Sequence, residues 1–392
     1  MGPAAADPSA PAADIPERVI VATHYYATGP AFDLEEFLLP RTRCLLFIAH
    51  PLYGGGGRSY ARWYEDGRLV KTLELPAGFR GARFIRDLLL TVRWVRQAGA
   101  YDLMIAGDNL LAMAGLWLRR TGRIRRLVLY SIDYVPRRFA NPVLNRAYRA
   151  VDRLASRRAN LVWNVSPAIE AARRARDGPR PTAPQLVVPV GTNVERIRRL
   201  PRATASPDRL AFVGNVLEKQ GLQVVIRALP ALRRALPSVS LLVLGDGQFL
   251  PEVKRLAEAA GVLPLIEFAG YIEDHREIER RLLGCAIGLA PYVPDAESFS
   301  RFADPGKIKL YLACGLPVIL TDVPPIARLI EQRGAGRIVP YEPAEIARAI
   351  VGLLTSSAEL DRARAAAAAL GAEYSWDRLF ARAFRESAPH LR

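Results

Sequence analysis

Residues 303–321, ADPGKIKLYLACGLPVILT, predict a loop, a helix, a tight turn and a buried strand. Asp304 and Pro305 mark the expected helix start, because Pro has no N–H to lose in the first turn and Asp favours the positive end of the helix dipole. The helix should reach Cys314 and stop at Gly315, since glycine most easily takes the left-handed conformation after a helix. The apolar run VIL that follows is typical of a fully buried parallel strand.

The start of this helix is a candidate site for an anionic ligand. It opens on Gly306 and Lys307, so free backbone N–H groups, the helix dipole and a mobile cation would converge there. A phosphate group suits such a site. A capped helix whose Lys307 is merely solvated fits these residues equally well, so both interpretations stay open at this point.

The chain is long enough for two domains, with 392 residues of which 50% are apolar. Cys44, Cys285 and Cys314 are isolated and have no CxxC pair or His at ligand spacing. Neither a disulfide framework nor structural zinc is therefore expected, and a reducing compartment fits. Residues 1–16 lack the basic and apolar regions of a signal peptide, so a disordered tail is expected. No apolar run reaches the ~18–20 residues that cross a membrane.

The net charge of +16 is concentrated in one half of the chain. Residues 1–205 hold 32 Lys and Arg against 17 Asp and Glu, whereas the remainder holds 23 against 22. A high-GC genome is one explanation for so much Arg. The physical interpretation is a polyanionic partner for the first half, such as a membrane surface, a lipid phosphate or a nucleic acid.

The first half alternates predicted strands and helices, which indicates a parallel sheet covered on both faces. Gly29 follows the first strand, where a backbone can approach a ligand closely. Asp108 follows the strand YDLMIA, and Asp133 and Tyr134 follow the strand LVLYSI. Because ligands of open α/β sheets bind outside the carboxyl ends of the strands, both aspartates are candidates for a general base. Capping of the following helix is the alternative role for each.

Residues 79–97, FRGARFIRDLLLTVRWVRQ, predict a basic amphipathic helix. Apolar residues recur at helical spacing and arginines surround them, with Phe84, Ile85 and Leu89 on the apolar side. Such a helix can lie on an anionic membrane. We favour the more ordinary arrangement, in which the apolar side packs on a sheet and the arginines point to water.

The second half repeats the pattern, and its early strands end in glycine, as at Gly214 and Gly245. The regular alternation predicts a second doubly wound domain. Neither VGNV nor GDGQ is a GxGxxG fingerprint, and no acidic residue stands where a dinucleotide ribose would need one. A nicotinamide dehydrogenase is therefore disfavoured.

The ordered set VGNVLEKQG, LLVLGDGQ, IEFAGYIED, GLAPY, ACGLPVILTDVP and SWDRLF resembles family 4 of the glycosyltransferases and its GT-B relatives. The likeness covers about residues 210–380, and NLVWNVSPAIEAA and VVPVGTN match more loosely in the first half. It implies two Rossmann-like domains, a nucleotide-sugar donor held by the second, and an acceptor that meets the first across the cleft. It also implies a C-terminal helix that crosses back onto the first domain.

The sequence departs from the retaining family 4 pattern at two places. Two Glu of that pattern are replaced by Phe302 and Leu310, and its diphosphate-binding Arg is Asn215 here, with the nearby Lys displaced to Lys219. These departures imply that the usual donor clamp has been rebuilt.

A shorter likeness, in GLAPY and ADPGKIKLY, is to the bacterial xanthan glucuronosyltransferase, an inverting membrane-associated GT-B enzyme. It implies donor contacts for Tyr292 and Lys307 and carries the catalytic aspartate onto Asp133. Asp108 stays a second candidate because of its place at a strand end. Tyr271 follows the FAG turn and is expected to face the donor nucleotide. The expected donor-binding residues are Lys307, Tyr292, Gly306, Asp304, Tyr271, Gly214, Asn215, Lys219 and Gly245. Gly29 and Tyr134 are expected on the acceptor side.

We therefore expect an α/β protein of the GT-B class, with a tail over 1–16, an acceptor-side domain over 17–202, a donor domain over 203–372 and a returning helix within 373–392. Its expected reaction is sugar transfer from a UDP- or GDP-linked donor to a lipid-linked or glycan acceptor, peripherally on the inner face of the cell membrane. No metal or cofactor is expected. Alternatives are a retaining family 4 transferase on a soluble acceptor and a non-transferring sugar-nucleotide epimerase. A nucleic-acid-binding module is disfavoured, because the basic residues lack interleaved aromatics and no helix-turn-helix or zinc signature is present.

Overall fold

The computed structural model describes residues 14–25, 29–52, 57–76, 83–178, 182–198, 208–295 and 298–391. Most of the predicted tail and of the four-glycine loop lies outside these residues. The chain divides into two compact units, Met1–Pro189 with Trp376–Arg392, and Val190–Ser375. The division falls ahead of the boundary expected at residue 202.

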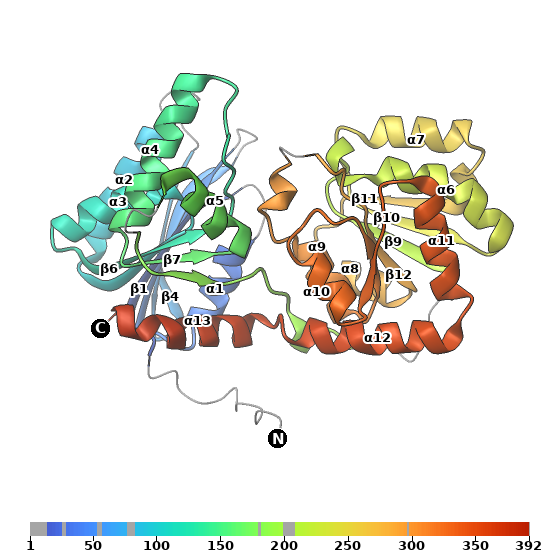
Figure 1. Cartoon of the computed structure of the whole chain (residues 1–392). Coiled ribbons are helices and arrows are strands. Elements are labelled where there is room, and N and C mark those ends of the chain that lie inside the picture. Colours follow the sequence, from blue (N-terminus) through green and yellow to red (C-terminus); the bar gives the residue numbers. More distant parts are fainter. Residues whose placement is uncertain are drawn as a thin grey trace. The chain divides into compact units, whose positions relative to one another are not determined.

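The first unit is built on one sheet, with strand order β4-β3-β2-β1-β5-β6-β7-β8 in the described residues (Figure 1). Its strands are β1 (Arg18–Tyr25), β2 (Cys44–Pro51), β3 (Arg58–Glu65), β4 (Arg68–Pro76), β5 (Tyr101–Ala106), β6 (Ile124–Ser131), β7 (Leu161–Asn164) and β8 (Gln185–Val187). Only the β2–β3 and β3–β4 pairs are antiparallel. Asp66 and Gly67 form the tight turn between β3 and β4, with φ of 46° and 74°, as such a two-residue turn requires.

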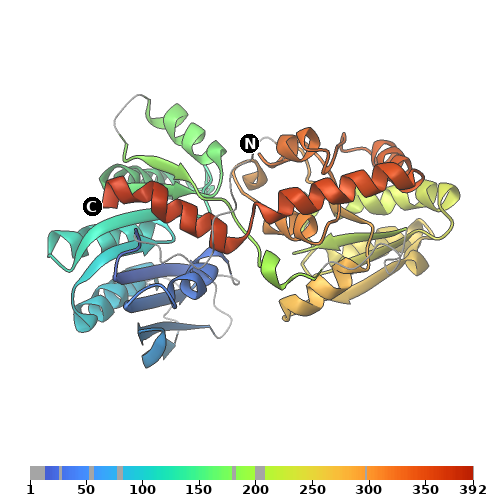
Figure 2. The same ribbon diagram turned by 90° about the horizontal axis from the view of Figure 1, so that it is seen from below.

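Helices cover both faces of this sheet, as predicted for the first half. The helices are α1 (Pro30–Leu38), α2 (Arg83–Ala98), α3 (Asn109–Arg120), α4 (Pro142–Arg158), α5 (Pro167–Asp177) and α13 (Trp376–Leu391). α3 packs between α2 and α4 in one layer, and α13 lies beside α1 on the other face (Figures 1 and 2). α13 is tied to the sheet by a buried hydrogen bond of 3.0 Å from Trp163 Nε1 to Ser387 Oγ, and Phe37 stacks on Phe384.

The second unit has a parallel sheet with strand order β11-β10-β9-β12-β13-β14. The strands are β9 (Arg209–Val213), β10 (Ser240–Leu244), β11 (Ile266–Gly270), β12 (Ile287–Ala290), β13 (Val318–Leu320) and β14 (Gly336–Ile338). The helices are α6 (Leu222–Ala235), α7 (Leu250–Ala259), α8 (His275–Leu283), α9 (Gly306–Ala313), α10 (Ala327–Gln332), α11 (Pro343–Leu354) and α12 (Ser357–Ala372). Apolar clusters fill both faces of the sheet. The predicted doubly wound domain is therefore present.

The orientation of α2 differs from the prediction. Ile85 and Leu89 are 66% and 64% exposed, whereas Asp87 and Thr91 are buried together with Trp94. The predicted packing of the apolar side was wrong, because two histidines of the sheet require polar partners from this helix. The exposed side of α2 thus combines large apolar side chains with arginines.

The predicted start of α9 is confirmed. The helix begins at Gly306 after Pro305, and the side chain of Asp304 does not cap it. The predicted end is confirmed, because Gly315 has φ of 72° directly after the helix. Asp304 instead accepts a hydrogen bond of 2.8 Å from the backbone N–H of Val190 and pairs with the buried Lys309. It balances a charge that would otherwise be buried alone.

Candidate functional site

Each sheet has one point at which its strand order reverses. In the first unit it lies between β1 and β5, and in the second between β9 and β12. Ligands of open α/β sheets bind outside the carboxyl ends of the strands at such points. The molecule therefore has two candidate sites, one in each unit.

In the second unit, glycines let backbone turns approach one another closely. Gly214 and Gly245 follow β9 and β10 with φ of 120° and 144°. A Cβ on Gly245 would lie 2.0 Å from the carbonyl oxygen of Gly214. Only glycine fits there, and the turns leave exposed backbone beside Asn215 at the edge of the sheet.

Lys307 reaches this end of the strands from the first turn of α9. Its Nζ donates to Gln220 Oε1 at 2.7 Å and lies 4.3 Å and 4.8 Å from the ring centroids of Phe212 and Tyr292. Burial lowers the pKa of Lys307 from its usual 10.5 to about 7. Tyr292 is only 2% exposed, so in this structure its ring packs against Lys307.

The other predicted donor residues lie around this lysine with different exposure. Gly306 starts α9, so its helix presents free N–H groups beside Lys307. Lys219 is exposed, and its Nζ lies 3.8 Å from the ring centroid of Phe299. Tyr271 is 77% exposed after the turn at Gly270. Cations, helix N–H groups and glycine turns together suit a diphosphate.

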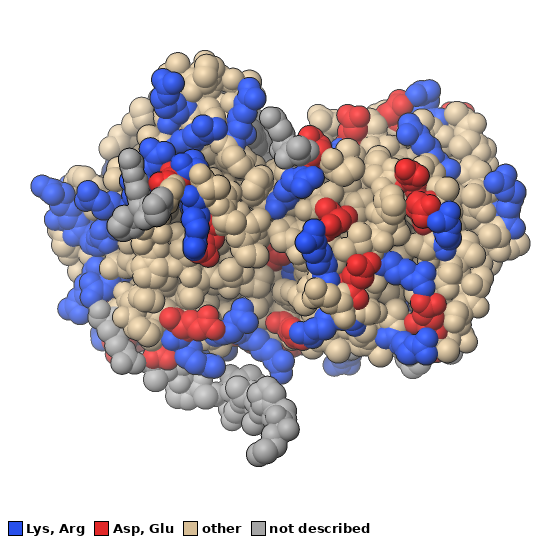
Figure 3. Space-filling model, in the orientation of Figure 1, with Lys and Arg blue, Asp and Glu red and all other residues tan. Residues whose placement is uncertain are grey.

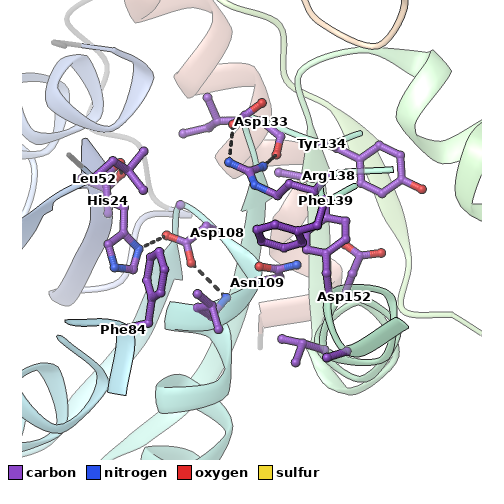
Figure 4. A pocket seen from close by; sticks show the side chains of 18 of the residues that line it. His24, Leu52, Phe84, Asp108, Asn109, Asp133, Tyr134, Arg138, Phe139 and Asp152 are labelled. Atoms are coloured by element: carbon purple, nitrogen blue, oxygen red, sulfur yellow. Dashed lines mark hydrogen bonds and ion pairs between the residues drawn. The ribbon is translucent and has the colours of Figure 1, made fainter. Parts of the chain in front are cut away.

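In the first unit, a cavity of about 320 Å³ lies at the carboxyl ends of β1, β5 and β6 (Figure 4). Asp108, Asp133 and Tyr134 all line it, so the structure brings these predicted residues together. Gly29 is not among the lining residues, and the turn at Gly29 only begins α1. Most of the remaining wall is apolar.

Asp133 is the more accessible of the two aspartates. Its side chain is 61% exposed, and Oδ2 accepts a hydrogen bond of 2.8 Å from Nη2 of Arg138 (Figure 4). Asp133 also lines the cavity. A carboxylate in this setting can accept a proton from a hydroxyl group placed in the cavity.

Asp108 is held on both sides. Oδ1 accepts from the backbone N–H groups of Leu110 and Leu111 at 2.9 Å each and so caps α3, while Oδ2 lies 2.7 Å from Nδ1 of His24. Burial raises the pKa of Asp108, but the attraction and hydrogen bond of His24 lower it more, to below its usual value. The alternative capping role is therefore real, and Asp108 is the weaker candidate for a base.

Behind Asp108 lies a buried cluster that the sequence did not predict. His24 Nε2 is 3.6 Å from Asp87, which is 3.5 Å from Nδ1 of His50, and His50 Nε2 is 2.9 Å from Oγ1 of Thr91. Burial lowers the pKa of His24, but attraction to Asp108 and Asp87 raises it to about 9. Burial lowers the pKa of His50 to about 4. The cluster thus carries one imidazolium between two carboxylates.

One signal could have revealed part of this cluster. His24 and His50 lie next to the last residues of two largely buried strands, β1 and β2, and the structure pairs them in register. Asp87 and Thr91 come from α2, and their spacing in the sequence carries no sign of the histidines.

Comparison with solved structures identifies the fold class. The crystal structure of Anabaena HepE in complex with UDP matches with a TM-score of 0.69 at 16% identity, over 95% of this chain and 99% of that chain. This likeness confirms the predicted GT-B fold. HepE was also solved with UDP-glucose.

Sequence comparison then finds a family match within the second unit. Residues 207–356 match the family described as "Glycosyl transferases group 1". The phosphatidyl-myo-inositol mannosyltransferase of Mycobacterium leprae is 27% identical over 194 residues, 48% of this chain. The putative colanic acid biosynthesis glycosyltransferase WcaL of Escherichia coli K12 is 27% identical over 264 residues, 66% of this chain. The chain covers 49% and 62% of the lengths of these two relatives.

Two further findings concern the described residues only. None of their helices has the length and apolar character that crossing a membrane requires. In the same residues, no three His, Cys, Asp or Glu side chains gather as a metal site. The independence of the reaction from metal stays a prediction.

Proposed function

We propose that this protein is a glycosyltransferase that moves a sugar from a nucleoside-diphosphate sugar to an acceptor hydroxyl group. The observation that carries the proposal is Lys307 at the open end of α9, beside the Gly214 turn, in a unit that matches the group 1 glycosyl transferases. The UDP complexes of HepE support a donor of this chemical class. UDP- and GDP-linked sugars are both candidates.

In the proposed reaction, two groups act in different units. Asp133 takes the proton of the acceptor hydroxyl, which then attacks the anomeric carbon in line with the departing diphosphate. Lys307 and the N–H groups at Gly306 stabilise the charge that builds on the diphosphate. This arrangement describes an inverting reaction of the kind implied by the xanthan enzyme, and a retaining reaction is the alternative. The configuration of the product, read by NMR, separates the two.

We further propose that the acceptor is lipid-linked or a glycan and that the protein works at the inner face of the cell membrane. Two features support a membrane contact. Helices α2, α3 and α4 contain eleven arginines, whereas Asp87 and Asp152, the acidic residues within them, are each 1% exposed. Lys and Arg side chains accordingly lie over the top and left edge of the first unit in Figure 3, where Figure 1 places these helices. Anionic lipid attracts such a surface.

A thermal-shift screen with UDP, GDP and their sugars tests the donor class, since a ligand that binds the folded state raises its stability.

Asp133→Asn tests the base in the presence of the active donor and a membrane lipid extract. We expect transfer to fall by roughly a thousandfold or more while donor binding is unchanged. Asp66→Asn in the β3–β4 turn is the matched control. Full transfer by Asp133→Asn would exclude Asp133 as the base. Turnover of donor without acceptor would favour an epimerase.

A further inference from the structure

We propose that the cavity of the first unit binds the apolar chain of a lipid-linked acceptor, with the acceptor's polar head at Asp133. This inference rests on the proposed function and decides between its two acceptor classes. It is carried by the composition of the cavity wall, the position of its polar groups and the surface at its rim.

The cavity wall is mainly apolar. Side chains from three separated segments contribute to it, namely Leu52, Phe84, Phe139, Leu144, Ala147 and Val151. Its volume of about 320 Å³ falls in the range of small-molecule pockets. A glycan buried here would lose water from its hydroxyl groups and find few partners, which is unfavourable for each group. An alkyl or prenyl chain makes no such demand.

Most of the polar lining groups lie where the strands end, and Tyr148 and Asp152 come from α4. Asp133 and Arg138 form one ion pair, and Asp108 is already engaged by His24 and two backbone N–H groups (Figure 4). Asp108 therefore has little capacity for further partners, whereas Asp133 is largely exposed. A ligand with one polar end and one apolar end matches this division.

The rim of the cavity continues into exposed apolar surface. Phe84 and Leu144 line the cavity, yet they are 43% and 53% exposed. Their neighbours Ile85 and Val143 are 66% and 69% exposed. Apolar side chains at the first turns of α2 and α4 thus lead from the surface into the cavity. Exposed apolar side chains at the mouth of a cavity suit an interaction site.

Charge around the rim favours an anionic lipid surface as the source of the chain. Arg137, Arg146 and Arg149 are exposed beside the start of α4, and the carboxylate of Asp152 is buried against Arg173. A nucleic acid would also be attracted to these arginines. It would gain little from Ile85 and Val143, which suit the boundary between lipid head groups and acyl chains.

The test uses alkyl maltosides below their micelle concentrations, with maltose as the head-group control. Octyl, decyl and dodecyl maltoside are titrated into the full chain by calorimetry. We expect affinity to rise about fourfold for each added methylene while the chain still lies inside the cavity. Maltose should not bind measurably. Equal affinity for maltose and dodecyl maltoside would overturn the inference.

Two matched pairs of variants locate the binding. Leu144→Asn changes the exposed rim, and Leu154→Asn changes a residue of the same helix that is 41% exposed and outside the cavity wall. Ala147→Phe enlarges a residue that lines the cavity, whereas Ala150→Phe enlarges another exposed alanine of α4 that does not line it. We expect Leu144→Asn and Ala147→Phe to weaken dodecyl maltoside at least tenfold and the two controls to leave it unchanged. Equal losses in test and control variants, or no loss in either, would contradict the assignment.

UDP titration of the same variants separates this inference from the proposed function. All four substitutions lie in the first unit, so UDP binding should stay at the wild-type level. Wild-type UDP binding without chain-length-dependent maltoside binding would overturn the lipid-chain inference alone. Chain-length-dependent maltoside binding without any nucleotide binding would contradict the proposed function and leave an apolar ligand site.

Discussion

A bound diphosphate would change the protonation of Lys307. In the free protein, burial lowers its pKa to about 7, and its closest partner is the neutral side chain of Gln220. A bound diphosphate favours the charged amine and therefore raises this pKa. Donor binding above pH 7 should then take up a proton, because the free lysine is largely neutral there and the bound lysine is charged.

This linkage predicts how UDP affinity depends on pH. The affinity should fall as pH rises above 7, by up to about tenfold per pH unit, until the pKa of the complex is reached. Calorimetry at pH 8 in buffers of different ionisation enthalpy measures the proton uptake. Lys307→Met should weaken UDP by about ten- to a hundredfold and abolish the uptake. Lys254→Met, an exposed lysine of α7, is the control, and wild-type behaviour of Lys307→Met would exclude the lysine from the site.

His24 has a pKa that links the stability of the first unit to pH. Its pKa in the folded protein is about 9 against the usual 6.5, so its stabilising contribution is complete below pH 6.5 and is lost as pH rises through 9. His24→Gln should therefore cost on the order of 3 kcal/mol more in unfolding free energy at pH 6 than at pH 9.5. Urea unfolding at both pH values measures the difference, with the exposed His390→Gln as control. A cost independent of pH would show that His24 is not paired as an imidazolium.

Residues at strand ends could be predicted, and residues that join distant segments could not. Asp133 follows a predicted strand and Lys307 opens a predicted helix, and the rules for ligands at strand ends and at helix starts gave them candidate roles. The partnership of His24 with Asp87 depends on how α2 docks on β1, which local sequence does not specify. The same holds for Asp304, which accepts a hydrogen bond from the backbone N–H of the distant Val190.

The turn after β10 requires glycine at position 245. Gly245→Ala would place a methyl group 2.0 Å from the carbonyl oxygen of Gly214, at a φ of 144° that alanine rarely adopts. We expect a loss of at least about 2 kcal/mol in stability and weaker donor binding, because the Gly214 turn must shift. Gly261→Ala, also at positive φ but with open space around it, should cost only about 1 kcal/mol. Equal costs, by chemical denaturation and UDP titration, would contradict the close approach.

α2 shows why amphipathicity did not predict which side of a helix is buried. Its apolar residues are numerous enough to cover both sides, and Leu90, Trp94 and Val95 fill the core while Ile85 and Leu89 face outward. Helical periodicity alone does not tell which of two apolar sides of a helix is buried. The buried carboxylate of Asp87 decides the matter, since it lies within 3.6 Å of His24 and 3.5 Å of His50 on the sheet.

At the scale of the molecule, arginines and exposed apolar side chains predict binding to anionic membranes. Vesicles with phosphatidylglycerol should bind the protein, binding should weaken as salt rises, and pure phosphatidylcholine should bind it poorly. Ile85→Glu should reduce binding at least about tenfold, since a carboxylate would enter the lipid interface. Val70→Glu, equally exposed on β4, is the control. Salt-independent binding, or equal losses in both variants, would argue against this surface as the one that binds the membrane.

The architecture was the most predictable level. Alternating strands and helices and glycines after the early strands of the second half predicted two doubly wound domains, because each of these signals is local. The division at Pro189 was not predicted, since residues 190–198 read as an extension of the first half but belong to the second unit. Val190 pairs there with Asp304, a contact between distant segments.

The most direct measurement is release of nucleoside diphosphate from a panel of UDP- and GDP-sugars, with and without membrane lipid extract. The account predicts release from at least one donor that depends on the lipid extract, yields a glycosylated lipid, and is lost in Asp133→Asn and Lys307→Met. Absence of binding and release for every donor, with the protein folded and bound to vesicles, would contradict it.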